Sequence, residues 1–159
     1  MEIYYIIPIV LFIAIFIIAE LLKKEPVPEF QKNQYLLNHS ELTFYKFLFQ
    51  NLPSSISIMC KVRLIDIVKP ISKGKSYTSD KNRVIAKHVD FVLINNENSE
   101  IKAVIELSGS SHLNPTRQTR DSFVDILLKN VGLPLFVVKV KPQYNTEDIK
   151  PIIESFIVH

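Results

Sequence analysis

The sequence predicts an α/β domain, a mixed β-sheet flanked by helices, behind an apolar N-terminal helix. Three observations predict this fold. Residues 3–22 are almost wholly apolar, whereas the rest of the 159-residue chain has ordinary globular composition. Residues 56–64, 88–94 and 101–107 read as strands. Residues 120–131 repeat apolar side chains at helical spacing before another apolar strand, so a crossover follows the first three strands.

The N-terminal run carries one charge, Glu20, near its end. A helix of this length spans about 30 Å, the thickness of a bilayer's hydrocarbon core. We expect residues 1–24 to form an uncleaved transmembrane anchor. A cleaved signal peptide is less consistent with the sequence, because no basic n-region precedes the apolar run. A buried globular helix is also less consistent, because the rest of the chain is too short to cover twenty apolar residues.

Charge and cysteine content indicate the compartment. All 19 Lys and Arg follow the apolar run, from Lys23 onward. The positive-inside rule then predicts a single-pass protein of the inner (cytoplasmic) membrane, with its globular domain in the cytoplasm. The single cysteine, Cys60, fits a reducing compartment and excludes a disulfide framework and a Cys-rich zinc site.

A proline-containing linker is expected over residues 25–36, and the globular domain over residues 37–159. The first domain helix is expected to begin at Asn38, with Glu41 completing a capping box, and to end at Pro53. Its apolar stripe consists of Leu42, Phe44, Tyr45, Leu48 and Phe49.

The strand at residues 56–64 alternates, with Lys61 and Arg63 on its polar face. Residues 69–83 are expected to form a loop. Residues 69–87 hold six basic residues and one acid. A solvated surface explains such a stretch, and so does contact with nucleic-acid phosphates or anionic lipid.

The strands at residues 88–94 and 101–107 are expected to form a hairpin. If Asn95 pairs with Ile101, Asp90 lies directly opposite Glu106, with Cβ atoms about 5 Å apart. The helix of residues 120–131 ends at Gly132, and a strand at residues 135–140 precedes a short C-terminal helix, whose apolar residues are Ile152, Ile153 and Phe156.

Two carboxylates held so close repel each other unless a positive charge intervenes. A divalent cation, Mg²⁺ or Mn²⁺, on Asp90 and Glu106 would provide it and assist phosphodiester hydrolysis. A wet sheet face with lysines nearby is the alternative. His112 follows the strand end at the Gly109 corner and is a candidate for proton transfer. Glu41 either points toward this site or only completes the helix cap.

Three basic residues are candidate phosphate contacts: Lys87, Arg117 and Arg120. Arg117 and Arg120 are three residues apart at the expected start of a helix. Positive charge is unfavourable there because of the helix dipole, which favours an anionic partner over simple solvation.

The blocks KVRLIDIV, KHVDFVLI, AVIELSGSSH and RDSFVDILLKNVGLPLFVVKV resemble the bacterial family named domain of unknown function 2726, over about residues 37–140. This resemblance implies a PD-(D/E)XK, restriction-endonuclease-like core, similar to that of very-short-patch repair endonucleases. It implies Asp90 and Glu106 as metal ligands. His112, Glu41 and the Arg120–Asp121 pair match further positions of the family.

Ser108 departs from the family, which usually has an acid there. A serine hydroxyl is a weak Mg²⁺ ligand, although Lys87 is a possible source of positive charge. With one cysteine, the chain also lacks the zinc ribbon of some relatives. The prediction is therefore a membrane-anchored, Mg²⁺-dependent nuclease acting on DNA. The alternatives are an inactive nuclease-fold module that binds nucleic acid and a membrane-associated interaction domain.

Overall fold

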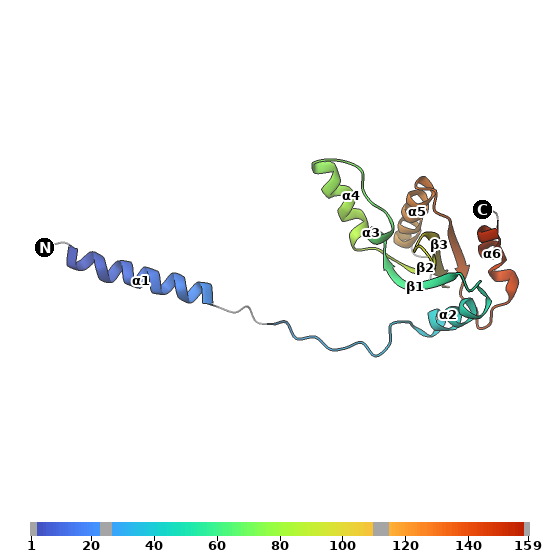
Figure 1. Cartoon of the computed structure of the whole chain (residues 1–159), viewed down its shortest axis with the longest axis horizontal. Coiled ribbons are helices and arrows are strands. Elements are labelled where there is room, and N and C mark those ends of the chain that lie inside the picture. Colours follow the sequence, from blue (N-terminus) through green and yellow to red (C-terminus); the bar gives the residue numbers. More distant parts are fainter. Residues whose placement is uncertain (1–2, 23–26, 110–114, 158–159) are drawn as a thin grey trace. The chain divides into compact units, whose positions relative to one another are not determined.

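The computed structural model describes residues 3–22, 27–109 and 115–157, with side chains described at residues 4, 6–22, 27–109 and 123–156 (Figure 1). The chain divides into two units, Met1–Gln34 and Tyr35–His159. The first unit contains one helix, α1 (Ile3–Leu22). Among the residues that the structure describes, none of the helices combines the length and the apolarity that a bilayer crossing requires.

The second unit is built on a four-stranded mixed sheet in the order β1-β2-β3-β4. Its strands are β1 (Ile56–Arg63), β2 (His88–Asn95), β3 (Ile101–Ser108) and β4 (Leu135–Lys139). The first three are antiparallel neighbours, and β4 lies parallel to β3. A parallel pair needs a crossover, which α5 (Pro115–Asn130) provides. The predicted mixed α/β architecture is therefore confirmed.

Helices cover both faces of this sheet. The elements are α2 (His39–Asn51), α3 (Leu64–Ile67), α4 (Lys75–Ile85), α6 (Lys150–Ile157) and a 3₁₀ turn (Thr146–Asp148). One face packs the α2 cluster, whose buried residues are Phe44, Leu48, Phe91, Leu93, Ala103, Ile105, Val138, Ile149 and Ile152. The other packs the α5 cluster, whose buried residues are Leu64, Val68, Val84, Val89, Val92, Val104, Val124 and Leu128.

The expected start of the first domain helix is confirmed. The Asn38 side chain accepts from the backbone N–H of Glu41, and the Glu41 carboxylate accepts from the N–H of Asn38, at 3.0 Å each. Two of the donors left unpaired at a helix start are thereby satisfied. Phe44 and Leu48, one turn and two turns further on, are fully buried against the sheet.

The expectation of a loop over residues 69–83 is wrong, because α4 begins at Lys75. Val84 is the buried residue of this helix, so α4 has almost no apolar periodicity from which to predict it. Gly74 precedes it at φ +61°, a conformation that glycine adopts without strain. The crossover helix also begins before the expected position 120. Its opening turns, PTRQTR, are polar, and proline suits a first helical position.

Candidate functional site

The register of the hairpin runs toward the two predicted acids. Phe91 pairs with Ile105 as the last pair of the ladder on this side, and one further step of the same register would set Asp90 opposite Glu106. The expected Asn95–Ile101 pair is wrong, since Ile94 pairs with Ile101 across a bulge between Leu93 and Ile94. On the other side of the bulge, the pairs from Leu93–Ala103 to Phe91–Ile105 follow the expected register. Both acids are half-buried.

Asp90 joins β2 to both neighbouring strands. Its Oδ2 accepts a hydrogen bond from the backbone N–H of Leu107 on β3 at 2.9 Å. Its Oδ1 lies 3.1 Å from the ammonium nitrogen of Lys61 on β1. Each carboxylate oxygen has a second lone pair, so these contacts leave Asp90 able to accept further partners.

Lys61 also reaches Glu41 on α2, with 2.7 Å between Nζ and Oε1. Glu41 is only 8% exposed and is the buried charged residue of the core. Its two predicted roles are therefore compatible, because Oε2 completes the helix cap while Oε1 pairs with Lys61. A single ammonium group thus bridges carboxylates from a helix and a strand that lie far apart in the sequence.

The site holds Lys61 as a permanent cation. Partial burial lowers the pKa of Lys61, but hydrogen bonds and charge attraction from Glu41 and Asp90 outweigh it, and the pKa lies above its ordinary value. Next to it, burial and then the charge of Glu41 raise the pKa of the Cys60 thiol. At neutral pH the lysine is charged and the thiol is neutral.

The backbone of Lys61 is left-handed, with φ +56° in the interior of a strand. For a residue with a Cβ this conformation costs about 1–2 kcal/mol. The pairs on either side, Cys60–Phe91 and Val62–Val89, keep one register. Cys60 and Phe91 nevertheless pack with the α2 cluster, whereas Val62 and Val89 pack with the α5 cluster. The expected single apolar face over residues 56–64 is therefore wrong beyond Cys60.

Sequence reasoning missed Lys61 because alternation assigned it to a solvated face with Arg63. That interpretation holds for Arg63, whose guanidinium pairs with Asp66 at 2.8 Å, with both groups largely exposed. The strand register could have identified Lys61 as a site residue. When the first two predicted strands are paired as antiparallel neighbours, Lys61 falls opposite Asp90.

The remaining predicted site residues have different positions. Lys87 lies outside the Lys61 network, with its Nζ 5.5 Å from the centroid of the Phe123 ring on α5. Ser108 ends β3, where it pairs with Lys139 of β4. His112 lies outside the described residues, as do the side chains of Arg117 and Arg120.

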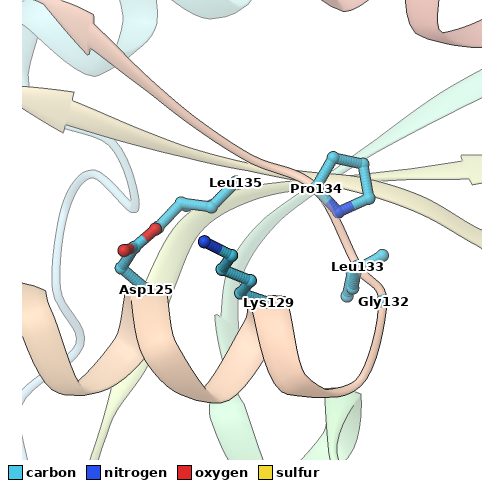
Figure 2. A pocket seen from close by; sticks show the side chains of 6 residues that line it. All are labelled: Asp125, Lys129, Gly132, Leu133, Pro134 and Leu135. Atoms are coloured by element: carbon cyan, nitrogen blue, oxygen red, sulfur yellow. The ribbon is translucent and has the colours of Figure 1, made fainter.

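A pocket of about 330 Å³ lies elsewhere, where the end of α5 meets the start of β4. It is lined by Asp125, Lys129, Gly132, Leu133, Pro134 and Leu135 (Figure 2). Figure 2 shows Asp125 and Lys129 rising from α5 toward the β4 segment. None of these residues belongs to the Lys61 network, so this pocket is separate from the candidate site.

The donor atoms of the candidate site suit a hard cation. Asp90 and Glu106 offer carboxylate oxygens, and Mg²⁺ takes one or two carboxylates while keeping water or phosphate oxygens as its other ligands. Within residues 3–22, 27–109 and 115–157, no group of three or more His, Cys, Asp or Glu side chains is arranged to hold a metal ion. Asp90 and Glu106 are two such carboxylates, the number that a Mg²⁺ ion with mostly water or phosphate ligands takes from a protein.

Comparison with known proteins identifies the family. Residues 33–156 match the family model described as protein of unknown function (DUF2726). No curated protein and no solved structure matches the chain. The match covers most of the chain and contains the sheet, both core clusters and the Lys61 network, and it confirms the predicted family. The chain belongs to the DUF2726 family.

Proposed function

We propose that this protein is a metal-dependent nuclease that hydrolyses phosphodiester bonds in DNA, on a PD-(D/E)XK, restriction-endonuclease-like core. One observation carries the proposal. Lys61, on a strained strand backbone, joins Glu41 and Asp90, and Asp90 also accepts from the backbone N–H of Leu107, the residue after Glu106. Strained backbone and closely spaced ionisable groups concentrate at functional sites. The order of a three-strand meander, a crossover helix and a parallel strand supports the fold assignment.

Each residue has a role in this proposal. Asp90 and Glu106 hold Mg²⁺ or Mn²⁺, which supplies water activation and neutralisation of phosphate charge. Lys61 donates hydrogen bonds to the phosphate as negative charge develops on it. Glu41 positions the Lys61 ammonium. His112 transfers a proton, and Arg117 and Arg120 contact the phosphate backbone.

The direct test is cleavage by the full chain in detergent. Supercoiled plasmid, duplex DNA, single-stranded DNA and RNA are offered with Mg²⁺, with Mn²⁺ or with EDTA. Asp90→Asn and Glu106→Gln should each slow cleavage by at least about 100-fold, because even outer partners of metal ligands are worth about 10- to 100-fold. The matched controls Asp125→Asn and Glu154→Gln remove exposed carboxylates and should cleave normally. Cleavage that persists in EDTA contradicts the proposal.

A second candidate function is nucleic-acid binding without turnover. The observation that favours it is that both carboxylate oxygens of Asp90, Oδ1 and Oδ2, already accept hydrogen bonds from within the protein. Such a module should bind oligonucleotides equally well after Asp90→Asn and cleave none of them. Ser108→Asp separates the two functions. A nuclease weakened by serine should gain activity, whereas a binding module should gain none.

We also propose that α1 attaches the chain to the inner membrane, with the α/β domain in the cytoplasm. The support is its composition: apolar side chains project on every side of α1, and those from Ile6 to Ile18 include many that are more than half exposed. A helix that is apolar all round needs an apolar environment. The basic residues that follow α1 support the orientation.

Membrane attachment is tested by fractionation in the presence of high salt. Replacing Ile9 and Phe16 of α1 by lysine should release the chain from the membrane pellet, since a charged side chain disfavours burial in the apolar part of a bilayer whereas isoleucine and phenylalanine favour it. The matched control replaces Val27 and Phe30, two exposed apolar residues outside α1, by lysine and should leave the chain in the pellet. Equal release of both variants contradicts the proposal.

A further inference from the structure

Two cations share one aromatic ring beside the candidate site. The guanidinium carbon of Arg83 lies 4.5 Å from the centroid of the Phe123 ring, and Nζ of Lys87 lies 5.5 Å from the same centroid. Both distances are within the range of cation–π attraction. Phe123 is itself partly buried against the α5 cluster. Arg83, Lys87 and Phe123 form what we call the ring cluster.

Among the residues whose side chains the structure describes, no carboxylate forms a salt bridge with either cation of the ring cluster. The charged groups of Arg83 and Lys87 both lie over the Phe123 ring, and like charges held this near each other repel. The acid nearest to Arg83 in the sequence, Asp80, accepts a hydrogen bond from Ser72 at 2.7 Å. An anion at the ring cluster would relieve the repulsion and gain two charge-assisted partners.

The backbone of Lys87 is fixed just before β2, the strand that carries Asp90. The carbonyl of Lys87 accepts from the backbone N–H of Leu64 at 2.8 Å, and β2 begins at the next residue. Asp90 follows three residues after Lys87, about 10 Å along a strand. One strand of a duplex carries a phosphate about every 3.4 Å of axis, so this separation corresponds to about three nucleotide steps.

We propose that the ring cluster binds a backbone phosphate of a nucleic acid whose cleaved bond lies at Asp90. This inference rests on the proposed function, and it assigns Arg83 and Phe123 to substrate binding along with Lys87. Guanidinium groups suit phosphate because they donate two parallel hydrogen bonds.

An anionic lipid surface fits this helix less well. Figure 1 shows α4 standing out from the sheet, and its final turns lie next to α3. Val84, the buried apolar residue of α4, packs inside the protein in the α5 cluster. Tyr77 and Ile85, the exposed apolar residues of α4, are eight positions apart and roughly 80° apart around the helix. α4 therefore lacks the continuous apolar face of a membrane-surface helix.

The experiment measures DNA binding by the full chain in detergent, using the anisotropy of labelled duplex oligonucleotides at several salt concentrations. Arg83→Gln with Lys87→Gln should weaken binding roughly 30-fold at 0.15 M salt and reduce the slope of log K against log salt by about 2. The matched control, Lys46→Gln with Lys129→Gln, removes two exposed cations elsewhere and should leave the slope unchanged. Equal behaviour of the two double variants overturns the inference.

Two further variants keep the test decisive. Should the double variant unfold by circular dichroism, Arg83→Gln alone carries the test, because Arg83 is exposed, and the slope should fall by about 1. Phe123→Leu keeps the apolar packing and both charges but removes the ring. It should weaken binding several-fold with little change in slope, since the cations lose their support.

The outcomes separate this inference from the proposed function. DNA binding that depends on the ring cluster, without cleavage under any metal, supports the inference and contradicts the nuclease. Cleavage by the wild type, together with unaltered DNA binding by the double variant, supports the nuclease and contradicts the inference. In nanodiscs, slower hydrogen exchange in α4 with anionic lipid but not with DNA overturns the inference in favour of a lipid surface.

Discussion

At the scale of single residues, charge neutralisation at the candidate site differs from what the sequence suggests. Two acids facing each other predict a metal ion, yet the protein also provides its own cation. Lys61 pairs with Glu41 and Asp90, and all three side chains are mostly buried. Removing one member of such a group leaves an uncompensated charge and costs more than the pair itself contributes.

Lys61→Met is expected to lower the free energy of unfolding by about 2–3 kcal/mol near neutral pH, discounted for the partial exposure of Lys61. The folded-state pKa of Lys61 is raised. Its stabilisation is therefore complete below the unfolded-state pKa of about 10.4 and is lost as pH rises through the higher folded pKa. Urea unfolding from pH 7 to 11 should show wild type and variant converging only at the alkaline end.

Lys46→Met is the control for general alkaline effects, because Lys46 is exposed on α2. It should follow wild type over the whole pH range. A difference between wild type and Lys61→Met that stays constant above pH 10.4 would show that packing, and not charge, stabilises this position.

At the scale of elements, β1 packs on both faces of the sheet. Ile56, Ile58 and Cys60 pack with the α2 cluster, and Val62 packs with the α5 cluster. The left-handed residue between them rotates the strand. The contacts of Lys61 with Glu41 and Asp90 offset the cost of that conformation, which amounts to about 1–2 kcal/mol.

A glycine–alanine comparison tests this element. In most strands glycine is less stable than alanine by roughly 0.5–1 kcal/mol. At position 61 the order should reverse by about 1 kcal/mol, because alanine keeps the strain and glycine removes it. Thermal unfolding of Lys61→Gly and Lys61→Ala measures this difference. The same two substitutions at Ser57, elsewhere in β1, should show the ordinary order.

Prediction from sequence succeeded where a pattern had a strong period. The hairpin and the cap of α2 follow from alternation and from the spacing of Asn38 and Glu41. It failed for α4, which buries only Val84 and so leaves no periodic signal. It also failed for Lys61, whose φ breaks the alternation on which a strand prediction depends.

At the scale of the whole molecule, both hydrophobic clusters lie within the second unit. The α2 cluster draws its buried residues from positions 44–152 and the α5 cluster from positions 64–128. All of these positions belong to Tyr35–His159. A unit with its own core has the physical basis for folding alone.

Residues 35–159 are therefore expected to unfold as one cooperative unit without the preceding segment. Their free energy of unfolding in urea should agree with that of the α/β domain in the full chain within about 0.5 kcal/mol, as for independent parts of a protein. Fluorescence of the four tyrosines at positions 35, 45, 77 and 144 and far-ultraviolet circular dichroism can follow both transitions. A broad, non-cooperative transition in the shorter chain would contradict this expectation.

The bulge between Leu93 and Ile94 has a consequence for changes in the length of the hairpin loop. It separates the turn at Asn95–Glu100 from the strand ends that carry Asp90 and Glu106. A one-residue change in loop length can be absorbed at the bulge, since an extra strand residue bends the chain locally without shifting the ladder beyond it. Inserting or removing one residue in this loop is therefore expected to leave the pairing of Phe91 with Ile105 unchanged.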